Sequence, residues 1–310
     1  MDPFVYYTQL YLKSFFNWRL ILSVLEAFGA LWILVSILDY FSQLPEFSSW
    51  LKTQWMLFCA SGILIGAYRS WPRLSYCYPL KNRDIQIEIK IKDLFRQKGA
   101  WVISTNTTFD IELSPDLISP ESLQGQFTSR FYSNWRALDN VVTGQLETIT
   151  PLENLSGDRR GKSKRYRFGE TIHVSPSKDH SAYLVAISDL NEHGNASGSL
   201  DNLRQALAGL WDFVRTRGSH GNLSIPILGT GPTRLPQTRE EIAIEIIRSF
   251  IAASAESTFC PKLTVVIHPS DVSEYGMDLQ NLDNFLSLAC KFNGVVSSET
   301  GNEALGQGIQ

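Results

Sequence analysis

The sequence predicts an α/β domain with a mostly parallel central sheet, preceded by a pair of membrane-spanning helices. Strands and helices alternate from Asp84 onward, as is typical of a parallel sheet covered by helices. Residues 1–76, in contrast, are rich in aromatic and aliphatic side chains and poor in charge. The predicted boundaries are an N-terminal segment at 1–19, a hairpin at 20–76, a domain at 81–292 and a flexible tail at 293–310.

The composition excludes several classes of protein. The chain has 310 residues, of which 44% are hydrophobic and 19% charged, so wholesale disorder is excluded. Its net charge of −3 disfavours a nucleic-acid-binding protein, which would usually be basic. Its 4 cysteines show no paired spacing, which indicates free thiols in a reducing compartment. The 5 histidines show no ligand spacing, and no metal site is predicted.

Two apolar runs, at 20–38 and 55–71, predict a helical hairpin in a membrane. The first has the length needed to cross a bilayer, and the second is shorter. Tryptophans lie near the ends or shoulders of both runs, where aromatic belts are found. Lysines and arginines before the first run and after the second outnumber the single Lys52 between them. The positive-inside rule therefore predicts a multi-pass membrane protein with both termini, and the domain, in the cytoplasm.

Three features of the N-terminal region have alternative explanations. Residues 4–19 place aromatic side chains on one helical face, which suits either an interfacial helix or an extension of the first span. Glu26 lies either inside the hydrocarbon, where a carboxylate is often functional, or among the headgroups. Gly62 and Gly66 form a G-x-x-x-G motif, which either brings two helices close together or occurs by chance.

The domain begins with an alternating strand at 85–91, and a second strand follows at 100–104. A helix is predicted at 119–148. Continuous apolar runs then predict strands covered on both faces, and they alternate with helices; the strands are at 182–188, 223–228 and 263–268, and the helices at 200–214, 238–250 and 282–289.

Three loops follow predicted strands, where ligands bind in such sheets. Gly229-Thr230-Gly231-Pro232 has glycines that let a phosphate approach backbone N–H groups, as in an anion nest. The loop Thr105-Asn106-Thr107-Thr108 offers side chains that suit ribose hydroxyls or, alternatively, a local turn. Asp93 suits an exocyclic amine or, alternatively, a helix N-cap.

Together these loops resemble a macro domain, the ADP-ribose-binding module. The family pattern Gly-Asp-Ile matches Lys92-Asp93-Leu94, and Asn-Ala-Ala-Asn matches Ile103-Ser104-Thr105-Asn106. The later Gly-Glu-Ala segment matches Gly169-Glu170-Thr171, and the phosphate loop matches 226–231. The resemblance covers residues 81–292 and implies a three-layer α/β/α fold with a mixed sheet.

The resemblance also implies the ligand-binding residues. Asp93 would hold the adenine amine, Asn106 would lie near the distal ribose, and the loop at 229–231 would wrap the diphosphate. The full implied set is Asp93, Leu94, Asn106, Thr107, Gly229, Thr230, Gly231, Pro232 and Thr233. Hydrolytic macro domains have a Gly-rich loop after the Asn motif, whereas here the stretch 109–115 has no glycine and Ile103 replaces the first Asn. This departure favours binding over catalysis.

Two spans fused to a macro-like domain resemble the membrane effectors of type II Thoeris antiphage defence. The resemblance implies that a TIR-domain enzyme makes an ADP-ribose derivative, an imidazole adenine dinucleotide, which the macro domain binds. The membrane part then stops growth, and because two helices cannot enclose a pore, a homo-oligomer is implied. The alternatives are a membrane-tethered ADP-ribosyl hydrolase and an anchor that recruits ADP-ribosylated proteins. The basic segment 159–167 suits either a solvated loop or anionic lipid and phosphate.

Overall fold

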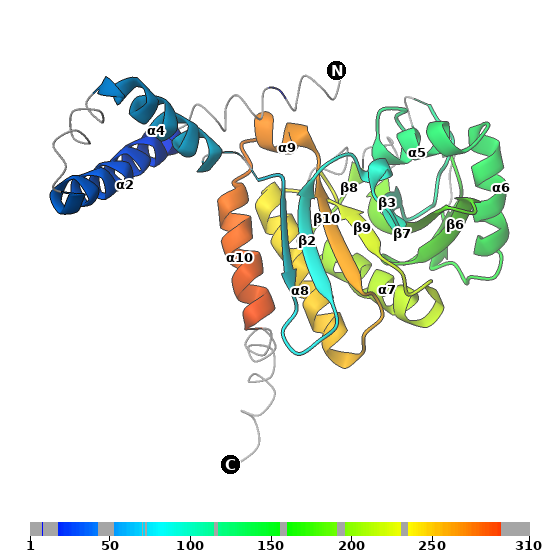
Figure 1. The fold of residues 1–310 in the computed structure, drawn as a ribbon. Coiled ribbons are helices and arrows are strands. Elements are labelled where there is room, and N and C mark those ends of the chain that lie inside the picture. Colours follow the sequence, from blue (N-terminus) through cyan, green and yellow to red (C-terminus); the bar gives the residue numbers. More distant parts are fainter. Residues whose placement is uncertain are drawn as a thin grey trace, which may run out of the picture. The chain divides into compact units, whose positions relative to one another are not determined.

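The computed structural model describes residues 8, 18–42, 53–69, 71, 73–114, 117–155, 160–190, 196–230 and 235–292. The predicted N-terminal segment 1–19 lies almost entirely outside the described residues, and the predicted tail 293–310 lies wholly outside them. The chain divides into two compact units, one with the N-terminal helices and one with the sheet. Figure 1 shows the elements of each.

The N-terminal unit contains helices α2 (Trp18–Ser42) and α4 (Trp55–Arg69). Within α2, Leu20–Phe41 is long and apolar enough to cross a membrane, and only 6% of its most apolar stretch is buried. This low burial distinguishes α2 from a core helix and indicates a membrane anchor. Helix α4 has 15 residues, or about 22 Å, and is shorter than the roughly 30 Å of hydrocarbon in a bilayer. The second predicted span therefore remains a proposal.

The two glycines of the G-x-x-x-G motif lie where α4 packs against α2. A Cβ atom added to Gly66 would lie 2.5 Å from Val24 Cγ2 and 2.7 Å from Val24 Cα, and one added to Gly62 would lie 2.7 Å from the ring of Phe28. Distances this short leave room only for hydrogen. The interpretation of the motif as a helix contact is confirmed, and the contact is made within one chain.

We expect Gly66→Leu to separate the two helices, because the new side chain would overlap the backbone of Val24. Overpacking of this kind costs about 2 kcal/mol. Gly29→Leu is the matched control, since a Cβ atom there meets nothing within 4 Å. Spin-label distances between α2 and α4 in lipid would measure the effect, and equal distances in both variants would contradict it.

The second unit is built on a sheet with the strand order β1-β2-β10-β9-β3-β7-β6. Neighbours from β2 through β7 run parallel, whereas the edge strands β1 and β6 run antiparallel to theirs. The sheet is therefore mixed. Its strands are β1 (Ser75–Pro79), β2 (Gln86–Ile91), β3 (Ala100–Asn106), β6 (Thr171–Ser177), β7 (His180–Leu190), β9 (Leu223–Pro226) and β10 (Lys262–Ile267), with β8 (Ala196–Ser197) paired to β7. A separate pair is formed by β4 (Glu153–Asn154) and β5 (Lys164–Arg165).

Helices cover both faces of the sheet (Figure 1), which gives the three α/β/α layers that the macro-domain resemblance implied. On one face, Phe127 of α5 (Leu123–Phe131) and Leu138 of α6 (Trp135–Leu146) pack with Ile103 and Leu184 in one buried cluster. On the other face, the ring of Tyr183 in β7 contacts Phe213 of α7. The helices on this second face are α7 (Leu200–Arg217), α8 (Arg239–Glu256) and α10 (Leu279–Lys291).

The structure corrects two details of the sequence prediction. The single helix expected at 119–148 is two helices, because Asn134 caps a new helix by accepting a hydrogen bond from the Ala137 N–H. The antiparallel edge strands β1 and β6 were not predicted. Thr238 and Glu241 form a capping box at the start of α8, which confirms the helix predicted from residue 238.

Candidate functional site

The predicted site residues follow strands that end at one edge of the sheet. Because β2, β9 and β3 belong to the parallel set, their carboxyl ends meet at this edge. Asp93 follows β2, Thr107 follows β3 and Gly229 follows β9. The topology thus brings together the three loops that the sequence indicated, at the edge where α/β proteins bind ligands.

Asp93 caps the short 3-10 helix η1 (Leu94–Arg96). Its Oδ1 accepts a hydrogen bond from the Phe95 N–H at 3.0 Å, and Arg130 Nη1 lies 3.3 Å from Oδ2. The N-cap alternative is therefore correct, yet the side chain stays 32% exposed and can accept another donor. Leu94 belongs to the buried core cluster, so only its backbone is available to a ligand.

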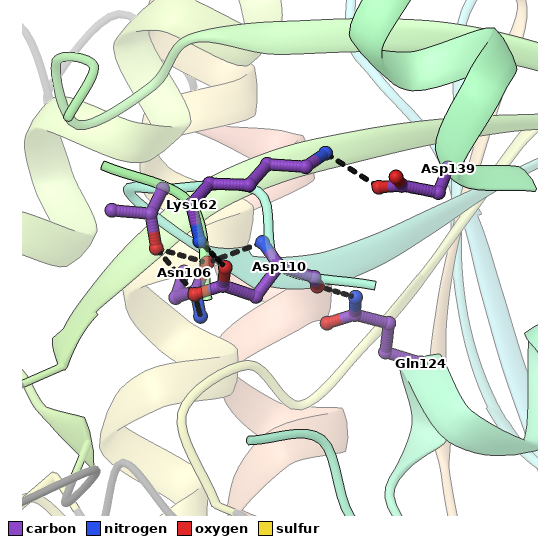
Figure 2. A network of polar contacts seen from close by, with 6 residues as sticks. Asn106, Asp110, Gln124, Asp139 and Lys162 are labelled. Atoms are coloured by element: carbon purple, nitrogen blue, oxygen red, sulfur yellow. Dashed lines mark hydrogen bonds and ion pairs between the residues drawn. The ribbon is translucent and has the colours of Figure 1, made fainter. Parts of the chain in front are cut away.

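Asn106 lies beside Asp110 in a network of polar contacts, as Figure 2 shows. Its side chain is 3% exposed. Its Nδ2 donates to Asp110 Oδ2 at 3.0 Å, and its Oδ1 accepts from the Asp110 N–H at 3.0 Å. The structure therefore has the local turn that the sequence left open as an alternative to a ribose contact.

Asp110 is the centre of this network and was missed as a site residue by sequence reasoning. Its carboxylate is 2% exposed. One oxygen accepts from the Lys162 N–H at 2.7 Å, and the other accepts from Thr108 Oγ1 at 2.6 Å as well as from Asn106. Its carbonyl oxygen accepts from Gln124 Nε2 at 2.7 Å. The acid thus joins the β3 turn to α5 and to the segment that begins at residue 160 (Figure 2).

Two features hold the 160–166 segment against the Asp110 turn. Gly161 has φ +101°, and a Cβ atom there would lie 2.6 Å from Asp110 Oδ1. A glycine at this position therefore allows the carboxylate to approach. Lys162 Nζ also pairs with Asp139 of α6 at 2.7 Å (Figure 2). The spacing Asn-x-x-x-Asp directly after a strand is the only sequence signal that could have indicated this network.

Thr107 is also buried by internal contacts. Its N–H donates to the Ser188 carbonyl at 2.8 Å, and its Oγ1 donates to Asp189 Oδ1 at 3.0 Å. Arg165 pairs with the same carboxylate at 3.0 Å. Within the described part of the chain, the buried hydroxyl of Thr105 at the end of β3 has no hydrogen-bond partner. Thr105 belongs to the loop that the sequence indicated, although it was not in the implied set of ligand residues.

Gly229 occupies a left-handed backbone conformation three residues after the end of β9, with φ +73°. A Cβ atom there would lie 2.4 Å from Leu235 Cδ1, and the Gly229 carbonyl accepts from the Leu235 N–H at 3.1 Å. The hydroxyl of Thr230 donates to the Ile227 carbonyl at 3.1 Å. Among the described residues, the backbone N–H groups of Gly229 and Thr230 have no hydrogen-bond partner. Gly231, Pro232 and Thr233 lie outside the described residues.

Gly169-Glu170 supports the fold at the start of β6. Gly169 has φ +85°, and a Cβ atom there would lie 2.7 Å from the Gln205 carbonyl of α7. The glycine therefore permits close packing of strand and helix. Burial raises the pKa of Glu170 above its usual value, although its hydrogen bond with the Thr171 backbone and the nearby Arg217 and Arg167 lower it.

The sequence of the sheet unit identifies its family. Residues 87–268 match the family described as "Thoeris protein ThsA, Macro domain". The chain belongs to this family. It is 28% identical over 153 residues to the Thoeris protein ThsA of Bacillus amyloliquefaciens (strain Y2), a match that covers 48% of this chain and 50% of that protein. The chain thus spans about half the length of this ThsA relative.

Solved structures with a similar architecture include macrodomains and an aminopeptidase. The Oceanobacillus iheyensis macrodomain with MES bound and the same macrodomain with ADP each cover 68% of this chain, with 15% identity and a TM-score of 0.47; 98% of each macrodomain is matched. A tomato leucine aminopeptidase mutant covers 70% of the chain and 38% of its own length, with 11% identity and a TM-score of 0.39. Likeness at this level carries no information about ligands, and the assignment to the ThsA macro domain family rests on the family match.

Proposed function

We propose that this protein is a membrane-anchored effector of Thoeris antiphage defence whose macro domain binds an ADP-ribose-derived dinucleotide. One observation carries the ligand proposal: two adjacent backbone N–H groups, at Gly229 and Thr230, have no partner among the described residues and follow a central strand at the ligand-binding edge. Membership in the ThsA macro domain family supports the same class of ligand.

The glycine loop suits a diphosphate for a physical reason. Successive N–H groups around a left-handed residue point into a concave nest that attracts anions. The φ of +73° at Gly229 is strained for a residue with a Cβ atom. A glycine at this position therefore lets the backbone adopt this conformation without the strain that a Cβ atom would add. We extend the proposed loop to Gly231, Pro232 and Thr233.

The other predicted ligand residues take different parts in the proposed site. The exposed oxygen surface of Asp93 would accept the adenine amine, with Arg130 fixing the carboxylate, and Leu94 would contribute through its backbone. Asn106 and Thr107 have internal partners, so we assign them to holding the β3 turn beside the distal ribose. The distal group of the ligand would be an imidazole, as the resemblance implies.

The proposal is for binding rather than turnover. Asp110 is the acid at the β3 turn, but its two carboxylate oxygens together accept from three donors. A general base must have its oxygen within reach of the water that it activates, and this carboxylate is 2% exposed. Because the Asp110 carboxylate is already occupied by these hydrogen bonds, the alternative of a membrane-tethered ADP-ribosyl hydrolase is disfavoured.

The effector part of the proposal concerns the membrane. Helix α2 would anchor the chain in the cell inner membrane, and α4 would enter the same bilayer with its glycines packed on α2. A ligand changes the state of the protein only through a difference in its affinity for two states. We propose that the dinucleotide, made by a TIR-domain enzyme, favours an oligomeric state in which the helices make the membrane leak.

Calorimetry on the full chain in lipid nanodiscs tests the ligand proposal. We expect heat of binding with ADP-ribose and with its imidazole analogue, and recovery of both ligands unchanged. Consumption of either ligand would favour the hydrolase. The absence of heat with every adenine dinucleotide would reject the binding function, whereas binding without ligand-dependent leakage from liposomes would favour the anchor that recruits ADP-ribosylated proteins.

A further inference from the structure

An ion pair joins the two N-terminal helices. Arg69 Nη2 lies 3.6 Å from Glu26 Oε2. Glu26 comes six residues after Leu20, where the apolar stretch begins, so it lies about 9 Å along the helix. A carboxylate at this depth in lipid is costly and is normally paired or turned toward protein or water.

The register of the two helices shows that Arg69 reaches inward to this acid. Gly66 of α4 meets Val24 of α2, and Gly62 meets Phe28. Because the helices are antiparallel, each residue forward along α4 corresponds to one residue back along α2. The backbone of Arg69 therefore lies near the level of Ile21, at the start of the apolar stretch. A long cationic side chain at such a position normally extends outward to the headgroups. Here the guanidinium extends the other way, toward Glu26.

The hairpin does not cover the pair it forms. The side chains of Arg69 and Glu26 are 55% and 65% exposed. In contrast, the glycine contact on the same two helices buries Gly62, Gly66 and Ala27. An opposite-charge pair within an otherwise apolar region therefore remains open on the outside of the hairpin, and something other than this hairpin must solvate it.

We propose that a second copy of this chain covers the Glu26–Arg69 pair. A two-fold contact would place Glu26 of each copy beside Arg69 of the other, because the same patch carries both charges and is complementary to itself. The four charges would then alternate in sign, and each would gain a second partner of opposite sign. The inference rests on the proposed effector function, which requires self-association, and it identifies the surface that would provide it.

Charge-reversal variants of the full chain distinguish contacts between copies from contacts within a copy. Glu26→Arg leaves two positive charges on the patch, and Arg69→Glu leaves two negative charges. Each variant alone should repel its own copies, and its association should fall by about tenfold or more. A mixture of the two variants should associate, because the patches then carry opposite charges. A contact confined to one chain would remain broken in that mixture.

The measurement is the number of labelled chains per liposome complex, counted by single-molecule photobleaching without any nucleotide and at a chain density at which the native protein associates. The proposed dinucleotide would shift this association further but is not required for it. The chain with both Glu26→Arg and Arg69→Glu is the folding control, since it carries both foreign side chains and should associate like the native protein. Asp39→Arg is the matched control for a reversed charge elsewhere on α2. If a charge-reversal variant does not insert into the membrane, Glu26→Gln and Arg69→Gln are used as the two variants. Each of them lacks one charge, and only in their mixture can Glu26 of one copy meet Arg69 of another.

Two outcomes would overturn the proposal. One is that the mixture stays as dissociated as each variant alone while the double variant associates, which would confine the pair to one chain or leave it to lipid headgroups. The other is that every variant associates like the native protein. Neither outcome affects the heat of ADP-ribose binding, whereas failure of the ligand proposal would remove that heat and leave the photobleaching counts unchanged.

Discussion

Gly229→Glu is expected to abolish the binding of ADP-ribose by the full chain, with a loss of affinity of about a hundredfold or more. Two charge-assisted hydrogen bonds, each contributing about 1.5–3 kcal/mol, would be lost from the N–H groups of Gly229 and Thr230. The new side chain would also bring a carboxylate to the place proposed for the diphosphate. Because φ is +73° and a Cβ atom would lie 2.4 Å from Leu235 Cδ1, even Gly229→Ala should shift the loop and weaken binding.

Gly144→Glu is the matched control for Gly229→Glu. Gly144 lies in α6, and a Cβ atom there meets nothing within 4 Å. This variant should bind ADP-ribose like the native protein and report any general effect of one more negative charge. Gly276→Ala adds a control for backbone strain alone, since φ is +68° and the position has open space. Calorimetry with unchanged affinity in Gly229→Glu would show that the diphosphate lies elsewhere.

The elements that sequence alone predicted well are those with a local pattern. Gly62 and Gly66 stand four residues apart, so their common helix face could be read directly, and the contact with α2 followed. The alternation of apolar runs with helices gave the parallel strands β7, β9 and β10, because each buried strand is a short continuous run. Gly229 was recognised because a glycine after a buried strand lets a phosphate approach the backbone N–H groups; its left-handed φ of +73° is a finding of the structure.

The parts that sequence missed lack a continuous local pattern. The edge strands β1 and β6 each pair with one neighbour, so their sequences lack the continuous apolar run of a central strand. The helix break at Asn134 depends on a single cap. Asp110 meets Lys162, which is 52 residues away, and no local spacing predicts that contact. The ligand contact expected at Asn106 followed from the macro-domain resemblance and from its place at the end of a predicted strand, and neither fixes the direction of the side chain.

The buried position of Asp110 leads to the second large effect. We expect Asp110→Ala to lower the free energy of unfolding of the sheet unit by at least about 3 kcal/mol, because three donors would be left without their acceptor in the interior. These donors are the Lys162 N–H, Asn106 Nδ2 and Thr108 Oγ1. Urea unfolding followed by tryptophan fluorescence would measure the loss. Hydrogen exchange should also accelerate at 160–166, since the contact with Lys162 would be absent.

Asp139→Asn is the control for this prediction, because it removes the negative charge that pairs with Lys162 Nζ. The Asp139 pair is partly exposed, and its loss should cost less than about 1 kcal/mol. Equal costs for Asp110→Ala and Asp139→Asn would contradict the central role of Asp110.

Whether Asp110→Ala stabilises or destabilises the protein also distinguishes a binding domain from a hydrolase. Catalytic acids are often held at a cost in stability, and their replacement then stabilises the protein. An acid that accepts from three buried donors destabilises the protein when it is removed, so a large loss favours a binding domain over a hydrolase.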